Sequence, residues 1–326
     1  MPSSTAPTTR PRAGVLAAYA ALALVWGSSF LLIKVALTGF DVTQVAVGRI
    51  ALGALTLVVL MAVSRTAWPR ERSLVGHLAV VGVLLCLAPF LLYSWAGQHL
   101  PSGLSAILNA TTPIWTALAV TAAVRSERLT RGQVAGVALG VVGVAVVMGL
   151  WRVVDDAAFA SSLPAQAACL GATACYGAGF AWMRRFVTGR HAHGPLAVAT
   201  GQVGIAAVLG LLLAGVLAVV GGGPVLPAVA PPAAAVGALV ALGALGTGLA
   251  YVWSTRVLAE WGSLAASSVT YLTPVVGVVA GVLVLGEHLT WNEPVGAVVV
   301  VVSVLLAQGR LRLPRWTRTP LATPSP

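Results

Sequence analysis

The chain has 326 residues, of which 58% are hydrophobic and only 8% are charged, and its formal net charge is +11. A soluble domain carries about a quarter charged residues, so this composition cannot cover a surface that faces water. We therefore expect an all-α integral membrane protein. The basic charge does not indicate a nucleic-acid-binding protein, because the arginines lie in short clusters between apolar runs.

Long apolar runs take up most of the chain. About 20 consecutive apolar residues are needed to span a bilayer as a helix. The first run is longer than the apolar core of a signal peptide, so we expect it to be retained. Breaks rich in charged residues, Pro or Gly separate ten predicted transmembrane helices, at residues 14–37, 42–63, 74–97, 101–124, 132–151, 164–185, 195–220, 233–256, 263–285 and 292–309.

The basic residues predict the orientation of these helices. If the N-terminus lies inside, the inner loops and tails hold 16 of the 19 lysines and arginines, and the outer loops hold only Arg152. Such a bias predicts cytoplasmic termini. We expect residues 1–13 and 310–326 to be cytoplasmic tails, and the protein to lie in a bacterial cell membrane with both termini inside.

The first predicted helix carries a short polar step in an apolar context. Trp26, Gly27 and Ser29 lie near its middle, where small residues let a neighbouring backbone approach closely. We expect Trp26 and Ser29 to face a substrate pathway. Lys34 lies near the end of the same helix, and we expect it to extend toward the membrane interface.

Arg49 lies about seven residues into the second predicted helix, or roughly 10 Å from its start at the helical rise of about 1.5 Å per residue. Two interpretations remain open for this buried cation. Its guanidinium could bind a substrate carboxylate through two hydrogen bonds. Alternatively it is a structural cation, paired with Asp41 or with carbonyl groups at a helix end.

Aromatic and small polar residues follow in the third and fourth predicted helices. Tyr93 lies at the end of the third, where we expect an interfacial aromatic belt, with an aromatic gate as the alternative. The fourth helix places its polar residues at spacings of four and three, which puts them on one face. That face could line a cavity or form hydrogen bonds between helices. Its candidate pathway residues are Ser105, Asn109, Thr112 and Pro113.

The second half of the sequence repeats the first in order. Glu127-Arg-Leu-Thr returns as Glu287-His-Leu-Thr, and matching pairs fall in several other helices. Because each half holds five predicted helices, an odd number, the second half enters the membrane from the opposite side, which predicts two inverted repeats at 14–155 and 156–309. The matched pairs are Trp26-Gly27 with Tyr176-Gly177, Lys34 with Arg184, Gly48-Arg49 with Gly201-Gln202, Ser102 with Ser263 and Thr112-Pro113 with Thr273-Pro274.

The repeat supplies candidate pathway residues in the second half as well. They are the counterparts or neighbours of the first-half candidates, and the same alternatives hold for them. The polar residues could line the central cavity or form hydrogen bonds between helices. For Tyr251, as for Tyr93, we expect an interfacial aromatic belt, with an aromatic gate as the alternative. The second-half candidates are Tyr176, Gln202, Tyr251, Ser267, Thr270, Tyr271 and Pro274.

The chain resembles the EamA-type branch of the drug/metabolite transporter superfamily over residues 14–309. The resemblance rests on the Trp26-Gly27 step, on Arg49 early in the second helix, and on a proline followed by Glu-x-Leu-Thr after the fourth and ninth helices. It implies a secondary transporter that alternates access around a midplane site, in a family that includes exporters of amino acids and other small metabolites.

Absent residue types exclude several other functions. No acid lies mid-helix, which argues against exchange of cationic drugs for protons. His191 and His193 lack a third ligand nearby in the sequence, so we expect no metal site. We also expect no cofactor and no enzymatic activity, because no nucleophile is paired with a base. The three cysteines all lie in apolar runs, and we expect them to be buried thiols.

The sequence therefore predicts a secondary transporter that exports small polar metabolites, such as amino acids. Its expected partners are this small-molecule substrate and the lipid bilayer, without nucleic acid, and the oligomeric state is open. The alternatives are import or flipping of a larger conjugate, such as a nucleotide sugar or a lipid-linked sugar, and a membrane-embedded transferase.

Overall fold

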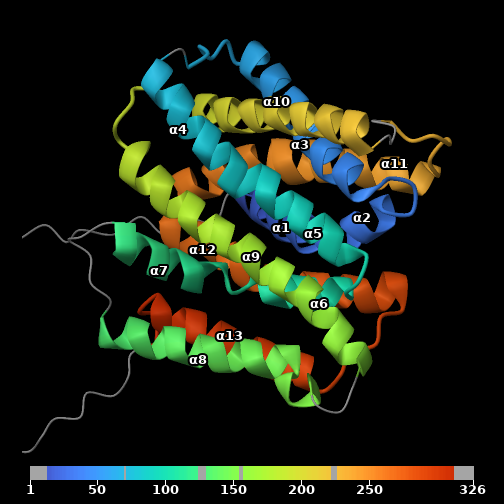
Figure 1. Cartoon of the computed structure of the whole chain (residues 1–326). Helices are drawn as coiled ribbons and strands as arrows, with labels where there is room; N and C mark the ends of the chain where they lie inside the picture. Colours follow the sequence, from blue (N-terminus) through green and yellow to red (C-terminus); the bar gives the residue numbers. More distant parts are fainter. Residues whose placement is uncertain (1–12, 70, 124–129, 154–156, 222–225, 312–326) are drawn as a thin grey trace, which may run out of the picture.

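The structure is a computed structural model that describes residues 13–69, 71–123, 130–153, 157–221 and 226–311. These residues form helices joined by short connections, and no strand occurs among them (Figure 1). The predicted tails at 1–13 and 310–326 lie almost entirely outside the described residues. Within the described part, the all-α prediction is confirmed.

The described residues of the first half form eight α-helices and one π-helical segment, followed by a 3-10 turn, η2, at Leu150–Val153. Their bounds are α1 Ala13–Gly27, α2 Ser29–Ala36, α3 Val42–Val63, α4 Arg72–Gly82, η1 Val83–Leu87, α5 Ala88–Gly97, α6 Ser102–Asn109, α7 Thr112–Ala123 and α8 Arg131–Met148.

The second half contains longer helices and one longer π-helical segment. Their bounds are α9 Ala157–Phe186, α10 Pro195–Gly221, α11 Ala233–Val240, η3 Ala241–Leu249, α12 Ala250–Leu285 and α13 Asn292–Ala307.

Several of these helices are suited to cross a bilayer. Among the described residues, six continuous helical segments are long and apolar enough, or seven if the bent pair α1–α2 counts as one span. The end of α12, Leu272–Leu285, and α13 are shorter apolar helices. Large apolar side chains such as Leu212 and Val220 are exposed on the outside of the molecule. Lipid is the solvent that such a surface requires, so the chain is a multi-pass membrane protein.

The first predicted helix bends in its middle. The axes of its two parts, α1 and α2, differ by 45° at a break next to Ser28. Gly27 packs directly on α12, where a Cβ atom on it would collide with Val276 and lie 3.1 Å from the carbonyl oxygen of Thr273. The close approach predicted for this small residue is therefore confirmed.

The fourth predicted helix is also interrupted. It consists of α6 and α7, separated at Ala110 and Thr111. Pro113 has no N–H to donate to the carbonyl of Asn109 four residues earlier. The hydroxyl of Thr112 donates to the Asn109 carbonyl oxygen instead, at 2.8 Å, so this oxygen has a hydrogen-bond partner despite the break in the helix.

The π-helical segments recur between the halves. η1 begins at Val83 and η3 at Ala241, a separation of 158 positions, and the same separation joins Tyr93 to Tyr251. π-helical turns place an extra residue in a helix and are frequent at functional sites. In η3 the hydroxyl of Thr247 donates to the carbonyl of Leu242, five residues earlier, at 3.2 Å.

One predicted boundary is wrong. The prediction ended the eighth helix at residue 256 and began the ninth at 263, whereas α12 is helical across this stretch. The intervening residues contain no proline, and Leu258, Ala259 and Glu260 among them are good helix formers. The charged pair that suggested a loop lies on one helix face, where Arg256 Nε and Glu260 Oε1 are 3.1 Å apart.

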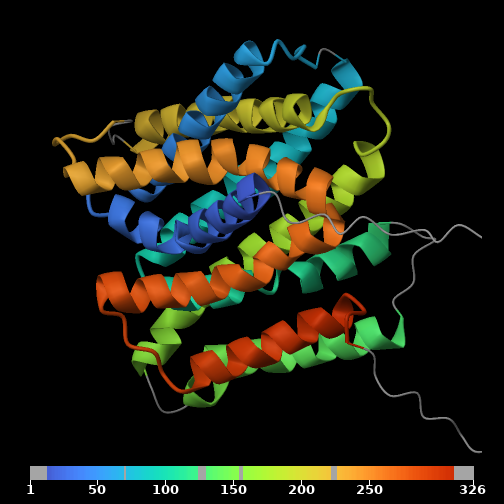
Figure 2. The ribbon, with the colours of Figure 1, turned by 180° about the vertical axis from the view of Figure 1, so that it is seen from behind.

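Contacts between the halves hold the molecule together. The α8 and α13 helices lie side by side in both views (Figures 1 and 2) and form the most extensive helix pair among the described elements. The α1 helix packs on α12, and α3 packs on both α10 and η3. Because α3 belongs to the first half and η3 and α10 to the second, a buried residue on α3 faces elements of the other half.

Candidate functional site

Arg49 is buried in α3, with only 8% of its surface exposed. Its Nε donates to the Thr247 hydroxyl of η3 at 3.2 Å, and the carbon of its guanidinium lies 3.9 Å from the centre of the Phe90 ring. Gly243 allows η3 to pack close to α3, because a Cβ atom at this position would lie only 2.9 Å from the Arg49 carbonyl oxygen. The site therefore joins α3, α5 and η3.

No carboxylate in the described part of the chain lies within ion-pair distance of Arg49. Asp41, one partner in the structural interpretation, instead accepts the backbone N–H of Gln44 at 2.8 Å and caps α3. The pairing with Asp41 is therefore wrong, and Arg49 is a buried cation held by a hydroxyl and an aromatic ring.

Gln202 of α10, the repeat counterpart of Arg49, is completely buried. Its Nε2 donates to the Tyr251 hydroxyl at 3.1 Å and to the Cys86 sulfur at 3.6 Å. Its Oε1 is buried without a hydrogen-bond partner. Cys86 lies in η1 and near Arg49, so the thiol is a neighbour of both repeat-related side chains.

Tyr93 does not lie in an interfacial belt as expected. Only 3% of it is exposed, and its hydroxyl donates to Oδ1 of Asn109 at 2.9 Å. Its ring centre lies 5.0 Å from that of Phe30 and 6.2 Å from that of Tyr176. The belt prediction failed because the hydroxyl finds its partner inside the bundle, in the amide of Asn109, and so needs no water.

Tyr176 connects the two groups of residues. Its ring lies beside Tyr93, and the residue lies near Arg49 and Cys86. The structure thus brings together six of the predicted residues in one region between the halves. They are Arg49, Tyr93, Asn109, Tyr176, Gln202 and Tyr251.

The remaining first-half candidates bond mainly to backbone. Trp26 Nε1 donates to the carbonyl of Gly246 in η3 at 3.2 Å. The hydroxyls of Ser29, Ser105 and Thr112 donate to carbonyl groups three or four residues earlier in their own chain segment. The polar face of the fourth predicted helix is therefore largely occupied by local hydrogen bonds.

Besides Tyr251, four second-half candidates lie on α12. Pro274 is buried inside the helix, closer to its C-terminal end than to its N-terminal end. The side chains of Ser267, Thr270 and Tyr271 lie outside the described residues.

Sequence reasoning missed three members of this region. Thr247 and Phe90 contact Arg49, and Cys86 contacts Gln202. The dense glycines of η3, at 243, 246 and 248, were the available signal for a close approach around Thr247. Phe90 and Cys86 carry no such signal, because apolar residues are the background of this sequence.

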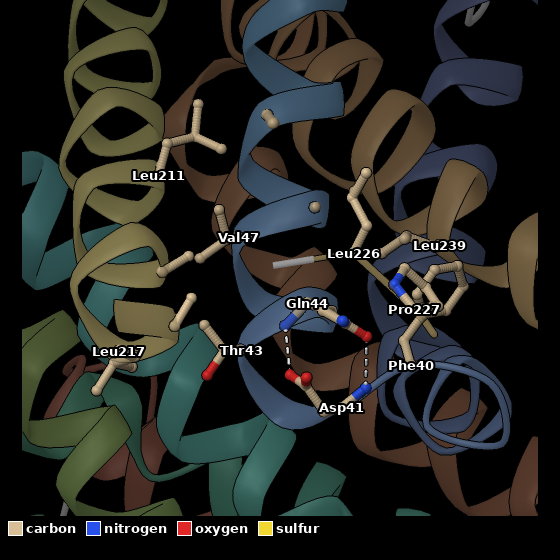
Figure 3. Close-up of a pocket in the computed structure, with 14 residues that line it drawn as sticks. Phe40, Asp41, Thr43, Gln44, Val47, Leu211, Leu217, Leu226, Pro227 and Leu239 are labelled. Carbon is tan, nitrogen blue, oxygen red and sulfur yellow. Dashed lines mark hydrogen bonds between the residues drawn. The ribbon is translucent and has the colours of Figure 1, made fainter. Parts of the chain in front are cut away.

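A separate cavity of about 360 Å³ lies between α3, α10, the segment with Leu226 and Pro227 that precedes α11, and Leu239 near the end of α11 (Figure 3). Val47, Leu211 and Leu239 make its wall mainly apolar, and the capping pair Asp41 and Gln44 lies at one end. No predicted pathway residue lines it. This cavity therefore lies on another face of α3 from the Arg49 guanidinium.

Lys34 takes part in an ion pair. Its Nζ lies 3.0 Å from Oε1 of Glu287, which also accepts the backbone N–H of Ser102 at 2.7 Å. The other carboxylate oxygen accepts the Ser102 hydroxyl at 2.9 Å and the Gly103 N–H at 3.1 Å. Glu287, from the second half, thus caps the N-terminus of α6 in the first half.

The pKa of Glu287 is lowered by this environment. Partial burial alone raises the pKa. Four hydrogen bonds lower it by more than burial raises it, and they come from the Ser102 and Gly103 backbone, from Lys34 and from the Ser102 hydroxyl. The carboxylate therefore stays charged at neutral pH.

The two loop histidines contact one acid. His191 Nδ1 lies 2.6 Å and His193 Nε2 lies 3.5 Å from the carboxylate of Glu71. Within the residues that the structure describes, no group of three or more His, Cys, Asp or Glu side chains is arranged to hold a metal ion.

Comparisons with known proteins identify a family and a fold. The model of the EamA-like transporter family matches residues 12–149 and 163–308. A protein of Streptantibioticus cattleyicolor named "Probable terminal-alkyne amino-acid exporter" is 30% identical over 124 residues, which cover 38% of this chain and 41% of that protein. A solved crystal structure superposes with a TM-score of 0.60 at 19% identity, over 92% of this chain and 99% of the other, and shows the same fold.

Proposed function

Because this chain belongs to the EamA-like transporter family, we propose that it is a secondary transporter that exports small carboxylate-bearing metabolites, amino acids foremost. It works in a bacterial cell membrane with both termini in the cytoplasm, as the distribution of its arginines predicts. Transport needs no covalent chemistry and no cofactor.

The observation that carries the proposal is the buried guanidinium of Arg49. A buried charge is costly unless an opposite charge or several hydrogen bonds compensate for it. The structure supplies one hydroxyl and one aromatic face to Arg49, and no carboxylate among the described residues. A substrate carboxylate matches the planar guanidinium and supplies the missing charge.

The surrounding side chains fit the rest of such a cargo. The rings of Phe90, Tyr93 and Tyr176 offer apolar faces to a hydrocarbon side chain, and the Tyr93–Asn109 bond fixes one wall. The named amino-acid exporter supports this cargo class, although its similarity covers less than half of either chain.

Alternating access follows from where the helices are interrupted. The first predicted helix bends beside Gly27, the fourth breaks at Ala110, and α12 contains Pro274. The two halves, 14–155 and 156–309, rock about these points as inverted repeats, so the Arg49 region opens to one side at a time.

The test is transport by the purified chain in proteoliposomes. A panel of labelled amino acids and organic acids is measured with the wild type and with Arg49→Gln, with and without a proton gradient. We expect saturable flux that falls at least about tenfold in the variant, which corresponds to about 1.4 kcal/mol of lost binding.

Arg131→Gln is the matched control, because Arg131 is exposed at the start of α8, and its flux should equal that of the wild type. Saturable flux that Arg49→Gln leaves unchanged would overturn the role of Arg49. Flux of none of the panel would overturn the cargo class and favour a larger conjugate.

A further inference from the structure

Gln202 presents a polar atom that the protein leaves unused. The residue is completely buried, and its Oε1 lacks a hydrogen-bond donor. Buried polar atoms in folded proteins nearly always have a partner, so an exception calls for an explanation. A ligand that donates a hydrogen bond in the working cycle is one explanation that the position of Gln202 allows.

The amide of Gln202 is held in a fixed orientation. Its nitrogen donates to the Tyr251 hydroxyl at 3.1 Å and to the Cys86 sulfur at 3.6 Å. In this arrangement the two neighbours hold the amide through its nitrogen and leave its oxygen as the atom without a partner. The oxygen is therefore a preorganised acceptor, and such an acceptor binds a donor without an ordering cost.

The acceptor lies close to the proposed carboxylate site. Cys86 contacts Gln202 and lies near Arg49, and α10, which carries Gln202, packs on α3, which carries Arg49. The sequence repeat pairs the same two residues, Gly48-Arg49 with Gly201-Gln202. One anchor thus comes from each half of the chain.

We propose that Gln202 Oε1 accepts a hydrogen bond from the ammonium group of the cargo, so that the site recognises α-amino acids by both of their charged groups. The proposal rests on the proposed function, in which Arg49 binds the carboxylate. An ammonium group has three donors and no acceptor, which suits a lone amide oxygen. A second arginine at position 202 would repel that group, so the glutamine makes the pair of anchors suitable for a zwitterion.

The experiment measures which half of the cargo each anchor recognises. Labelled L-leucine counterflow is measured in proteoliposomes of the full chain, with three unlabelled competitors. L-leucine carries both groups, 4-methylpentanoate lacks the ammonium group, and 3-methylbutylamine lacks the carboxylate. The inhibition constant of each is determined for the wild type, Arg49→Gln and Gln202→Leu.

In the wild type we expect leucine to bind at least about tenfold tighter than 4-methylpentanoate. Gln202→Leu should weaken the binding of leucine at least about tenfold and leave the inhibition constant of 4-methylpentanoate unchanged. Arg49→Gln should weaken the binding of leucine and of 4-methylpentanoate by the same factor. It should leave the inhibition constant of 3-methylbutylamine unchanged. Each single bond to a charged group is of the strength that produces such ratios.

Gln166→Leu is the matched control. Gln166 of α9 is also buried with an unpartnered Oε1, and its Nε2 donates to the Ser162 hydroxyl at 2.9 Å. It belongs to no part of the proposed site, so its leucine inhibition constant should equal that of the wild type. An equal loss in this variant would mean that any buried glutamine matters, which overturns the proposal.

Two further outcomes would overturn it. One is a Gln202→Leu variant whose inhibition constant for leucine equals that of the wild type. The other is a Gln202→Leu variant in which the binding of leucine and the binding of 4-methylpentanoate weaken equally, which would show that the amide recognises the carboxylate. If Gln202→Leu does not fold, the wild-type comparison decides alone, because equal binding of leucine and 4-methylpentanoate contradicts recognition of the ammonium group.

Failure of the proposed function looks different. In that case neither leucine nor another amino acid of the transport panel shows saturable flux, and no competitor acts. Loss of the Gln202 proposal alone leaves amino-acid flux and its dependence on Arg49 intact.

Discussion

At the scale of single residues, Glu287 is a carboxylate with an unusually complete set of partners. It accepts three hydrogen bonds from Ser102 and Gly103 and pairs with Lys34. The N-terminus of α6 adds its own positive potential, which favours an anion there. One side chain thus ties the end of α12 to α2 and α6.

Glu287→Gln should destabilise the protein by about 2 kcal/mol, because hydrogen bonds to a charged group are worth about 1.5–3 kcal/mol. The glutamine keeps the size of the side chain but loses the charge that Lys34 and the helix terminus stabilise. Thermal unfolding of the purified protein in detergent measures the change. Glu260→Gln is the control, since its pair with Arg256 is exposed and is worth at most about 1 kcal/mol.

The same carboxylate predicts an acid dependence of stability. Because its pKa is lower in the folded state than the ordinary 4.5, its contribution is fully present above that value. It is lost as the pH falls through the lowered pKa of the folded protein. The wild type should therefore lose melting temperature over this acid range more steeply than Glu287→Gln, and parallel curves would contradict the assignment.

Individual site residues could be predicted from sequence better than their partners could. Arg49, Asn109 and Gln202 stand out because polar groups are rare in apolar helices. Their contacts with Thr247, Tyr93 and Cys86 join residues far apart in the chain. Only the packed fold decides such pairs, since one sequence contains no record of which helices touch.

At the scale of elements, the interrupted fourth predicted helix determines how α6 and α7 can move. Asn109 ends α6 and Thr112 begins α7, so the two segments meet next to the residue that binds Tyr93. Pro113 causes the interruption because it cannot donate to the Asn109 carbonyl.

Pro113→Ala should supply a backbone N–H that can donate to the Asn109 carbonyl, and so favour a continuous helix. We expect a raised melting temperature, because alanine is about 3 kcal/mol more favourable than proline inside a helix. We also expect leucine counterflow to fall severalfold, since a stiff helix moves less readily. Thermal unfolding and counterflow of the same preparation test both parts, and unchanged flux in a stabilised variant would show that this break takes no part in transport.

Element boundaries were predicted well where the sequence has strong breaks. The prediction 42–63 coincides with α3, which begins after the capping residue Asp41. The stretch between 256 and 263 misled the prediction, because a charged pair can lie on a helix as readily as in a loop. The π-helical segments η1 and η3 were not predictable, since no residue pattern distinguishes them from α-helix.

At the scale of the whole molecule, the pair α8–α13 joins the last helices of the two halves. Gly136 of α8 faces the backbone of α13, where a Cβ atom would lie 2.5 Å from the Ala307 nitrogen and 2.7 Å from the Ser303 oxygen. Asn292 at the start of α13 donates to the carbonyls of Val146 and Val147 at the end of α8. The pair is therefore fixed along its length.

Gly136→Ala should destabilise the protein by about 1–3 kcal/mol, because backbone atoms cannot move aside for the added methyl group. Gly132→Ala is the control one turn earlier, where the nearest atom to a new Cβ is the Leu306 oxygen at 3.9 Å. That variant should be neutral or more stable, since alanine favours the helix. Thermal unfolding compares them, and equal melting temperatures would contradict the tight packing.

The pairing of α8 with α13 also has a consequence for biosynthesis. A ribosome completes α8 long before it reaches Asn292, so the glycine face of α8 must wait in the membrane for a partner near the end of the chain. A nascent chain that stops before α13 would leave this face, and the carbonyls that Asn292 binds, open to lipid. A chain without α13 thus carries a surface that quality control can recognise.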